Sequence, residues 1–270
     1  MFNQLVHIML TNEERKMSAH IPFMTSSKGS RAIIFEQGFM DTGKVWDDVI
    51  ASITEKDLQK VYLDLPGMGA LTAIEGEISL ARYARDVASV IEQIGKPFVI
   101  VGQSMGAKIA ELVTRMQPGL ARGLVLLTPV PLEGVKASAE MVAPLKQLGE
   151  HPEIEKVLRK QFSRGLTEES LDRLCELNVD VRPDVVVSLV DMWNEGYPGG
   201  DSPSQFTRPV LIMRGMDDPF VTNEMVAGIT SRFRRVIKQD IHRGGHWSHV
   251  EQSEAVTQYL NQYLKLIEWE

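Results

Sequence analysis

The chain has 270 residues, of which 43% are hydrophobic and 24% are charged, values that are ordinary for a soluble globular protein. The net charge of -7 and the lack of a basic run argue against nucleic acid or an anionic membrane as the main partner. The single cysteine, Cys175, excludes a disulfide within the chain and a cysteine-based zinc site. Its helical spacing from Leu171 and Leu174 predicts a buried structural thiol.

The cellular location is predicted from two kinds of segment, a signal peptide and a membrane span. Residues 1–7 show no basic region, apolar core or cleavage site of the kind that a signal peptide carries. No apolar run approaches the length of a membrane span. We therefore expect a cytoplasmic protein with no membrane partner.

The first half of the chain alternates between short β-branched runs and amphipathic segments. Residues 3–27 are weakly patterned and predict one or two antiparallel edge strands. Buried strands are expected at 32–35, 61–63, 98–101 and 123–127. Helices are expected at 46–53, 80–94 and 107–113. Ser79 is positioned to cap the second of these helices and Gly95 to end it.

The alternation stops between about residues 130 and 205. Four helices are expected there, at 139–148, 152–163, 167–177 and 183–195, with prolines at the start of the second and fourth. Strands and helices then alternate again, at 210–213, 223–231, 235–237 and in a final helix. This order predicts an α/β fold with a mostly parallel sheet flanked by helices. We expect a core of residues 1–130 and 206–270, and a helical cap of residues 131–205 over the carboxyl edge of the sheet.

The motif Gly102-Gln103-Ser104-Met105-Gly106 stands between the expected strand at 98–101 and the helix that follows. Strand, G-x-S-x-G and helix in this order predict a nucleophile elbow. Only glycine fits two residues before and after the serine, and the tight turn lifts the Ser104 hydroxyl clear of the sheet. The alternative is an ordinary glycine-rich turn with a solvated serine, which the flanking strand and helix disfavour.

A serine hydroxyl needs a general base to act as a nucleophile at neutral pH. His246 follows two glycines after the last expected strand, and these let its loop approach the elbow. His249 is a second candidate base, because loop position alone does not separate neighbours. His242 is expected to be solvent-exposed.

The base in turn needs a carboxylate to fix its tautomer. Asp217 and Asp218 directly follow the expected strand at 210–213, again at a carboxyl end. Adjacent side chains point in different directions, so we expect one of them to serve and the other to lie at the surface.

These residues together resemble an α/β-hydrolase-fold serine hydrolase, over residues 31–128 and 209–268. The chain order Ser104, Asp218, His246 is the order of that family. The resemblance implies Asp218 as the acid, because the family acid commonly lies three residues after a strand-ending glycine, here Gly215. It implies His246 as the base, because a segment like Glu251-Gln252-Ser253-Glu254 commonly follows that histidine. The run Asp64-Leu65-Pro66-Gly67-Met68-Gly69 also resembles the D-x-x-G-x-G loop of the family.

One position departs from the family pattern. Many relatives carry His-Gly after the first buried strand, where this chain has Gln37-Gly38. The backbone N–H groups of Phe39 and Met105 are still expected to form an oxyanion hole. Two roles stay open for Gln37: its amide holds the loop in place, or it contacts an unusual substrate.

The substrate pocket is expected to have an apolar wall from the cap. Trp193 is the strongest candidate for this wall, because it ends a helix just before a Gly/Pro loop. Further candidates are Met141, Val142, Leu145, Leu189 and Met192. No metal or organic cofactor motif is visible, and no carboxylate stands at ligand spacing from the histidines, so we expect neither a metal nor a cofactor.

The predicted function is hydrolysis of an ester-type small-molecule substrate, a carboxylic ester or else a thioester or lactone, through an acyl-serine. C–C bond hydrolysis and cofactor-free perhydrolysis are alternatives on the same triad. A non-catalytic binding protein is a further alternative. Such proteins usually lack a triad residue, and this chain carries all three.

Overall fold

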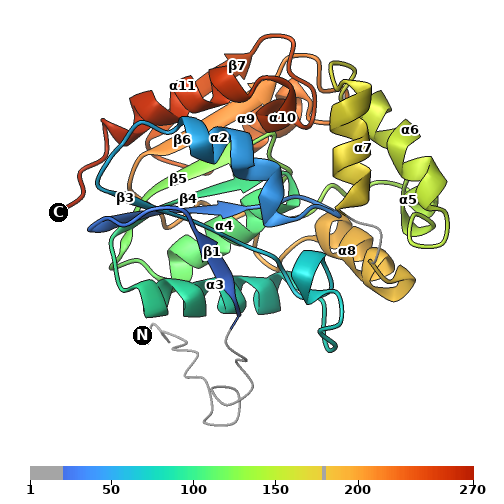
Figure 1. Ribbon diagram of the computed structural model, residues 1–270, viewed down its shortest axis with the longest axis horizontal. Helices are drawn as coiled ribbons and strands as arrows, with labels where there is room; N and C mark the ends of the chain where they lie inside the picture. Colours follow the sequence, from blue (N-terminus) through green and yellow to red (C-terminus); the bar gives the residue numbers. More distant parts are fainter. Residues whose placement is uncertain (1–20, 178–180) are drawn as a thin grey trace.

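A seven-stranded sheet forms the centre of the computed structural model, which describes residues 21–177 and 181–270 (Figure 1). The strand order is β1-β3-β2-β4-β5-β6-β7. The first strand pairs antiparallel with β3, and every other neighbouring pair is parallel. The strands are β1 (Phe23–Thr25), β2 (Arg31–Glu36), β3 (Leu58–Leu63), β4 (Phe98–Gln103), β5 (Ala121–Leu127), β6 (Val210–Gly215) and β7 (Val236–Ile241). The predicted α/β class and mostly parallel sheet are confirmed.

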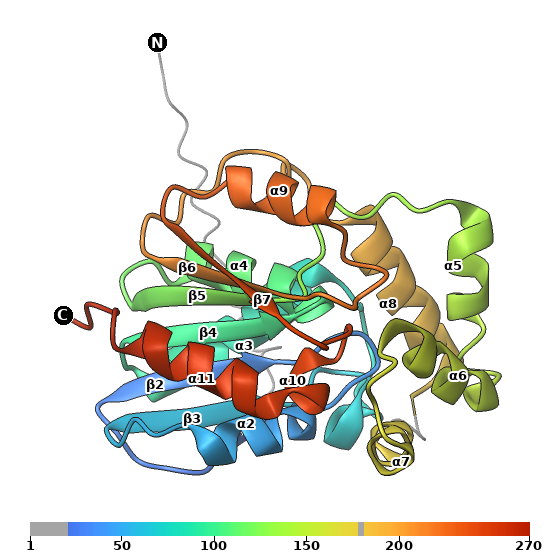
Figure 2. The same ribbon diagram turned by 90° about the horizontal axis from the view of Figure 1, so that it is seen from above.

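Helices cover both faces of this sheet (Figure 2). One face carries α3 (Leu80–Ile94), α4 (Met105–Met116) and α9 (Asn223–Ser231). The other carries α2 (Asp47–Ser52) and α11 (Ser253–Leu264). Short elements complete the core: α10 (Ser248–Glu251) and the 3-10 helices η1 (Gly43–Trp46) and η2 (Gly69–Leu71).

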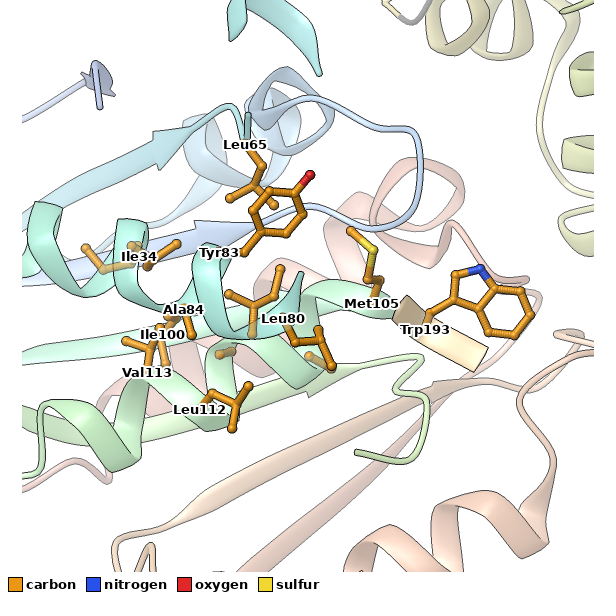
Figure 3. Close-up of a cluster of buried hydrophobic side chains, with 14 of the residues drawn as sticks. Ile34, Leu65, Leu80, Tyr83, Ala84, Ile100, Met105, Leu112, Val113 and Trp193 are labelled. Carbon is orange, nitrogen blue, oxygen red and sulfur yellow. The ribbon is translucent and has the colours of Figure 1, made fainter. Parts of the chain in front are cut away.

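Each central strand has two buried faces, as a parallel sheet between helices requires. In β2, Ala32 and Ile34 point into the cluster beneath α3 and α4, while Ile33 and Phe35 point into the cluster beneath α2 and α11. Figure 3 shows part of the first cluster, which extends from Ile34 to the carboxyl end of the sheet.

The ends of α3 are set by the residues expected from the sequence. The Ser79 hydroxyl accepts a hydrogen bond from the Arg82 N–H at 3.1 Å and so caps the helix. Gly95 ends it with a left-handed φ of 63°.

Four helices between β5 and β6 lie at the carboxyl end of the strands (Figures 1 and 2). They are α5 (Ala139–Lys146), α6 (Pro152–Phe162), α7 (Glu168–Glu176) and α8 (Pro183–Glu195), and we call them the insertion. Their bounds agree with the predicted ranges within two residues, and prolines begin α6 and α8 as expected. The division into a core and a cap at residues 130 and 205 stays a prediction.

Cys175 in the last turn of α7 is half-buried rather than buried, and this partial burial raises the pKa of the thiol. Of the edge strands expected in residues 3–27, β1 is present, and residues 3–20 lie outside the described residues. No helix in the described ranges combines the length and the apolar character needed to cross a bilayer.

Candidate active site

The turn between β4 and α4 holds Ser104 in a backbone conformation that is unusual for a residue with a side chain. Its φ is 52° and its ψ is -115°. A Cβ on Gly102 would overlap the backbone of Gly106. A Cβ on Gly106 would lie 2.5 Å from the carbonyl oxygen of Gln37. The two glycines are therefore required by close approach of the backbone on either side of the serine.

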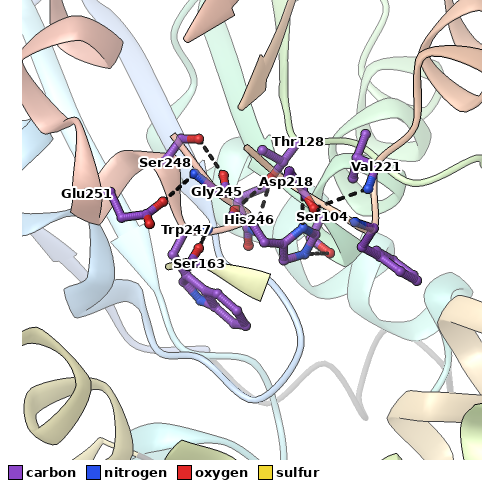
Figure 4. A network of polar contacts seen from close by, with 12 residues as sticks. Ser104, Thr128, Ser163, Asp218, Val221, Gly245, His246, Trp247, Ser248 and Glu251 are labelled. Carbon is purple, nitrogen blue, oxygen red and sulfur yellow. Dashed lines mark hydrogen bonds and ion pairs between the residues drawn. The ribbon is translucent and has the colours of Figure 1, made fainter. Parts of the chain in front are cut away.

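Three buried polar side chains from three separate loops meet at this turn (Figure 4). His246 Nε2 lies 2.9 Å from Ser104 Oγ, and His246 Nδ1 lies 2.8 Å from Asp218 Oδ2. With the ring proton on Nδ1, the imidazole donates to the carboxylate and accepts from the serine hydroxyl. This is the geometry in which an imidazole can take the hydroxyl proton while a carboxylate stabilises the resulting cation.

The two adjacent aspartates occupy different environments. Asp218 is buried, and its Oδ1 accepts hydrogen bonds from the N–H groups of Phe220 at 2.8 Å and Val221 at 3.2 Å. Asp217 is exposed, and its N–H donates to the Gly244 carbonyl at 2.9 Å. The structure therefore brings Asp218, and not Asp217, to the histidine.

His249, the alternative base, lies in the apolar core beside Trp46. Its ring centroid is 4.4 Å from that of Trp46, and among the described residues neither ring nitrogen has a hydrogen-bond partner. Burial lowers the pKa of His249 to about 3, so the ring is neutral at physiological pH. The structure thus pairs His246 alone with the serine, and His242 is exposed as expected.

Gln103, the variable residue before the serine, connects the elbow to the histidine loop. Its Nε2 donates to the His246 carbonyl at 3.0 Å and to Thr128 Oγ1 at 3.2 Å. The Thr128 hydroxyl donates to the same carbonyl at 3.0 Å. Both residues position the backbone of His246. Sequence reasoning missed them, because the motif assigns no meaning to this position.

The two backbone groups expected to form an oxyanion hole border the same space as the serine. Met105 is the first residue of α4, so its N–H has no acceptor within the helix. Phe39 lines the cavity above Ser104. Their role in binding an oxyanion stays a proposal.

Gln37 lies behind this loop and does not line the cavity. Its side chain is fully buried. With the amide oriented to suit its neighbours, Nε2 donates to the Leu63 carbonyl at 3.0 Å and Oε1 accepts from the Leu65 N–H at 3.2 Å. Of the two roles left open by the sequence, this geometry corresponds to holding the loop rather than to contacting substrate.

A buried ion pair joins α6 to the loop after β2. Arg159 of α6 is 2% exposed, and its Nη1 lies 2.9 Å from Asp41 Oδ1. The same guanidinium donates to Glu155 at 2.7 Å and to the Met40 carbonyl at 2.9 Å. Asp41 also accepts from the indole N–H of Trp247 at 2.8 Å, and the guanidinium stacks over that ring at 4.7 Å. One arginine therefore connects the insertion, the Phe39 loop and the histidine loop.

The carboxyl end of α6 contacts the histidine loop directly. The Phe162 carbonyl accepts the His246 N–H at 2.9 Å, and Ser163 Oγ accepts the Trp247 N–H at 2.8 Å. A Cβ on Gly245 would lie 2.6 Å from Ser163 Cα, so glycine is needed for this close approach. The backbone position of His246 thus depends on both Gln103 and α6.

A small cavity of about 60 Å³ opens over Ser104. Its lining is Phe39, Gln103, Ser104, Val130, Leu145, Phe162, Trp193, Phe220, His246 and Trp247. No lysine, arginine, aspartate or glutamate is among these lining residues. Two of the residues expected to form the wall, Leu145 and Trp193 of the insertion, therefore line the cavity.

The remaining expected wall residues lie elsewhere. Val142, Leu189 and Met192 are buried in the apolar cluster that contains α4, and Met141 is 58% exposed on α5. The expectation that these four residues line the pocket is not met, because three of them pack in the core and the fourth lies at the surface.

A sequence model of the alpha/beta hydrolase family matches residues 33–258. The chain belongs to the alpha/beta hydrolase family. In solved structures, this hydrolase is similar to a bromoperoxidase from Bacillus anthracis (TM-score 0.81, 16% identity, covering 90% of this chain and 94% of the other). It is also similar to an esterase from Exiguobacterium antarcticum (TM-score 0.81, 18% identity, 91% and 95% covered). These likenesses show the fold.

Curated relatives give a second comparison for this hydrolase. It is 27% identical over 240 residues to a 2-hydroxy-6-oxononadienedioate/2-hydroxy-6-oxononatrienedioate hydrolase of Klebsiella pneumoniae, covering 80% of this chain and 79% of the relative. It is 24% identical over 282 residues to the enzyme of the same name from Escherichia coli, covering 94% of each. Within the described residues of this hydrolase, no group of three or more histidine, cysteine, aspartate or glutamate side chains is placed to hold a metal ion.

Proposed function

We propose that this hydrolase cleaves esters with small, uncharged acyl groups through an acyl-serine intermediate. The observation that carries the proposal is the line of contacts from Asp218 through His246 to Ser104 Oγ, which ends in an apolar cavity. A hydroxyl in contact with an oriented imidazole is a nucleophile ready for acyl transfer.

Each residue of the line has one task in the reaction. Ser104 Oγ bonds to the carbonyl carbon of the ester while its proton passes to His246 Nε2, and Asp218 stabilises the cation that forms. The N–H groups of Phe39 and Met105 hold the oxyanion of the tetrahedral intermediate. The intermediate collapses with loss of the alcohol, which takes the proton from Nε2. A water molecule then repeats the sequence on the acyl-serine and releases the acid.

The size of the cavity favours short acyl groups. Its volume of about 60 Å³ is far below the roughly 300–1,000 Å³ that is usual for pockets that hold small molecules. An acetyl or propionyl group fits such a space, whereas a long chain requires the walls formed by Leu145 and Trp193 to move. We therefore infer the highest kcat/KM for acetate or propionate esters.

C–C bond hydrolysis is the second candidate, because the curated relatives carry the names of such enzymes. The dienedioate in those names bears two carboxylates, and burying them needs paired cations. The lining residues of this cavity include no lysine or arginine, and Arg159 already contacts Asp41, Glu155 and Met40. This lack of cations in the lining favours ester hydrolysis over C–C bond hydrolysis of a dicarboxylate.

One set of assays separates the candidates. Wild type and Ser104→Ala are compared for labelling by a fluorophosphonate, for hydrolysis of p-nitrophenyl esters from acetate to octanoate, and for cleavage of a 2-hydroxy-6-oxo-dienedioate. We expect labelling and short-ester hydrolysis in wild type only, with kcat reduced by about 10³-fold or more in the variant. Cleavage of the dienedioate without ester turnover would establish the second candidate. Equal activity in a folded Ser104→Ala protein would refute the mechanism.

A further inference from the structure

Lys108 lies on α4 one helical turn after Ser104, and its side chain is only 1% exposed. A lysine is rarely buried to this degree without a partner. Its Nζ donates to the main-chain carbonyl of Trp193, at 2.5 Å, near the end of α8. This contact ties the helix that begins at the serine to the helix that supplies the indole of the cavity wall.

The surroundings of Lys108 explain how the buried amine is tolerated. Burial lowers its pKa to about 7, and the nearby positive charge of Lys136 adds to this effect, while the carboxylate of Glu133 opposes it. Its acceptor lies in the last turn of α8, where the partial negative charge of the helix end favours a cationic donor. The lysine is thus held by a directional contact to Trp193, which belongs with Met105 to the apolar cluster of this face (Figure 3).

The position of the Trp193 ring matters to the whole pocket. Its edge-on contact with Phe220 has a centroid distance of 5.7 Å, and Phe220 makes a similar contact with His246 at 5.7 Å. The Phe220 N–H also donates to Asp218 at 2.8 Å. A shift of the α8 end would therefore move the wall that stands against the acyl group.

We propose that Lys108 is a positioning residue for substrate selection, which fixes the end of α8 so that the Trp193 indole closes the acyl side of the cavity. This inference rests on the proposed ester hydrolysis. Without the lysine contact, the end of α8 is held less firmly and the cavity accepts longer acyl groups. The lysine is then expected to act on the choice among esters rather than on the chemistry at Ser104.

The test is Lys108→Met, which keeps the length of the side chain and removes the donor. The measured quantity is the ratio of kcat/KM for p-nitrophenyl hexanoate to that for the acetate. One methylene in an apolar pocket changes selectivity by about 10-fold or more, so partial loosening of one wall is expected to raise this ratio about fivefold. The rise should come mainly from a lower KM for the hexanoate, with fluorophosphonate labelling of Ser104 retained.

Lys136→Met is the matched control. Lys136 is exposed and donates to the Glu195 carbonyl at 2.5 Å, at the same end of α8 but away from the cavity lining. Its substitution is expected to leave the selectivity ratio unchanged. In a Trp193→Ala background, Lys108→Met should add nothing to the ratio, because the ring through which it acts is gone.

An unchanged ratio in folded Lys108→Met overturns the inference, and wild-type ester turnover in the same assay leaves the proposed function standing. An additive effect in the Trp193→Ala background also overturns it. If Lys108→Met does not fold, Lys108→Gln keeps a polar end but falls short of the Trp193 carbonyl. This variant must then change the ratio by about twofold or more, as expected for loss of one hydrogen bond to the wall. A wild-type ratio in folded Lys108→Gln refutes the inference.

Discussion

Helices α6 and α8 both border the cavity, yet different forces hold them to the rest of the molecule. Helix α6 is joined by the buried pair of Arg159 and Asp41 and by hydrogen bonds into the histidine loop. Helix α8 packs through Val185 and Leu189 in the apolar cluster, with Lys108 as a polar contact near its end. Directional contacts fix atomic positions, whereas apolar packing fixes shape and tolerates change. We infer that α6 governs the rate and α8 the choice of substrate.

Neither α6 nor α8 supplies a reacting group, so the largest effect on kcat is expected from a change in Asp218, Ser104 or His246. Asp218→Asn is expected to lower kcat by about 10³–10⁴-fold, because the histidine loses the carboxylate that orients it. Asp217→Asn, at the exposed neighbouring position, is the control and should change kcat far less. Steady-state kinetics on both variants decide the matter, and the opposite ranking would assign the acid to Asp217.

The role of α6 is tested by Arg159→Met. Loss of the guanidinium leaves Asp41 buried without its cation, so the free energy of unfolding should fall by about 3–5 kcal/mol. Displacement of the Phe39 and histidine loops should lower kcat by about 10–100-fold with a smaller change in KM. Denaturant titration and ester kinetics measure the two effects.

Arg173→Met is the control for that change, since Arg173 makes an exposed ion pair with Asp48 at 3.1 Å. Such pairs contribute about 1 kcal/mol or less, and this one lies outside the cavity lining. If Arg159→Met does not fold, Ser163→Ala removes a single acceptor of the histidine loop. Unaltered kcat in folded Arg159→Met, or in Ser163→Ala where Arg159→Met does not fold, would remove the distinction between the helices.

The role of α8 is tested by Trp193→Ala, which enlarges the cavity without touching the histidine loop. Longer esters should gain about 10-fold in kcat/KM relative to acetate, because the indole no longer excludes them. The labelling rate of Ser104 by a small probe reports whether the triad is preserved. Met141→Ala, on the exposed side of α5, should leave the rank order of the esters as in wild type. Retention of that order in Trp193→Ala would show that the indole only packs the helices.

The smallest effect on activity is expected at His249, where the readout is acid stability. Its pKa is about 3 in the folded protein and 6.5 ordinarily, so the unfolded chain binds the additional proton between these values. Stability is therefore lost as the pH falls from 6.5 towards 3, by about 1.4 kcal/mol per pH unit from this group. His249→Phe should remove that slope and keep the packing on Trp46. His242→Gln, at an exposed site, should keep the slope of wild type, and equal slopes in all three proteins would contradict the assignment.

Local patterns of strand, turn and helix predicted the parallel sheet and Ser104. The same patterns left Asp217 open beside Asp218 and His249 beside His246, and only the family resemblance selected the two residues that meet Ser104. The contacts that support them were not predictable. Gln103 and His246 are 143 positions apart, and Lys108 and Trp193 are 85 apart. Nothing in the residue types marks such pairs, since glutamine and lysine side chains ordinarily face water.

The positive φ of Ser104 sets thermal stability against activity at this position. A side chain in this region of φ and ψ costs about 1–3 kcal/mol, which glycine avoids. Replacement of this serine by glycine should therefore raise the melting temperature while removing the proposed nucleophile. A library sorted only for heat resistance would enrich inactive proteins at this position, so selection for robustness has to be coupled to selection for turnover.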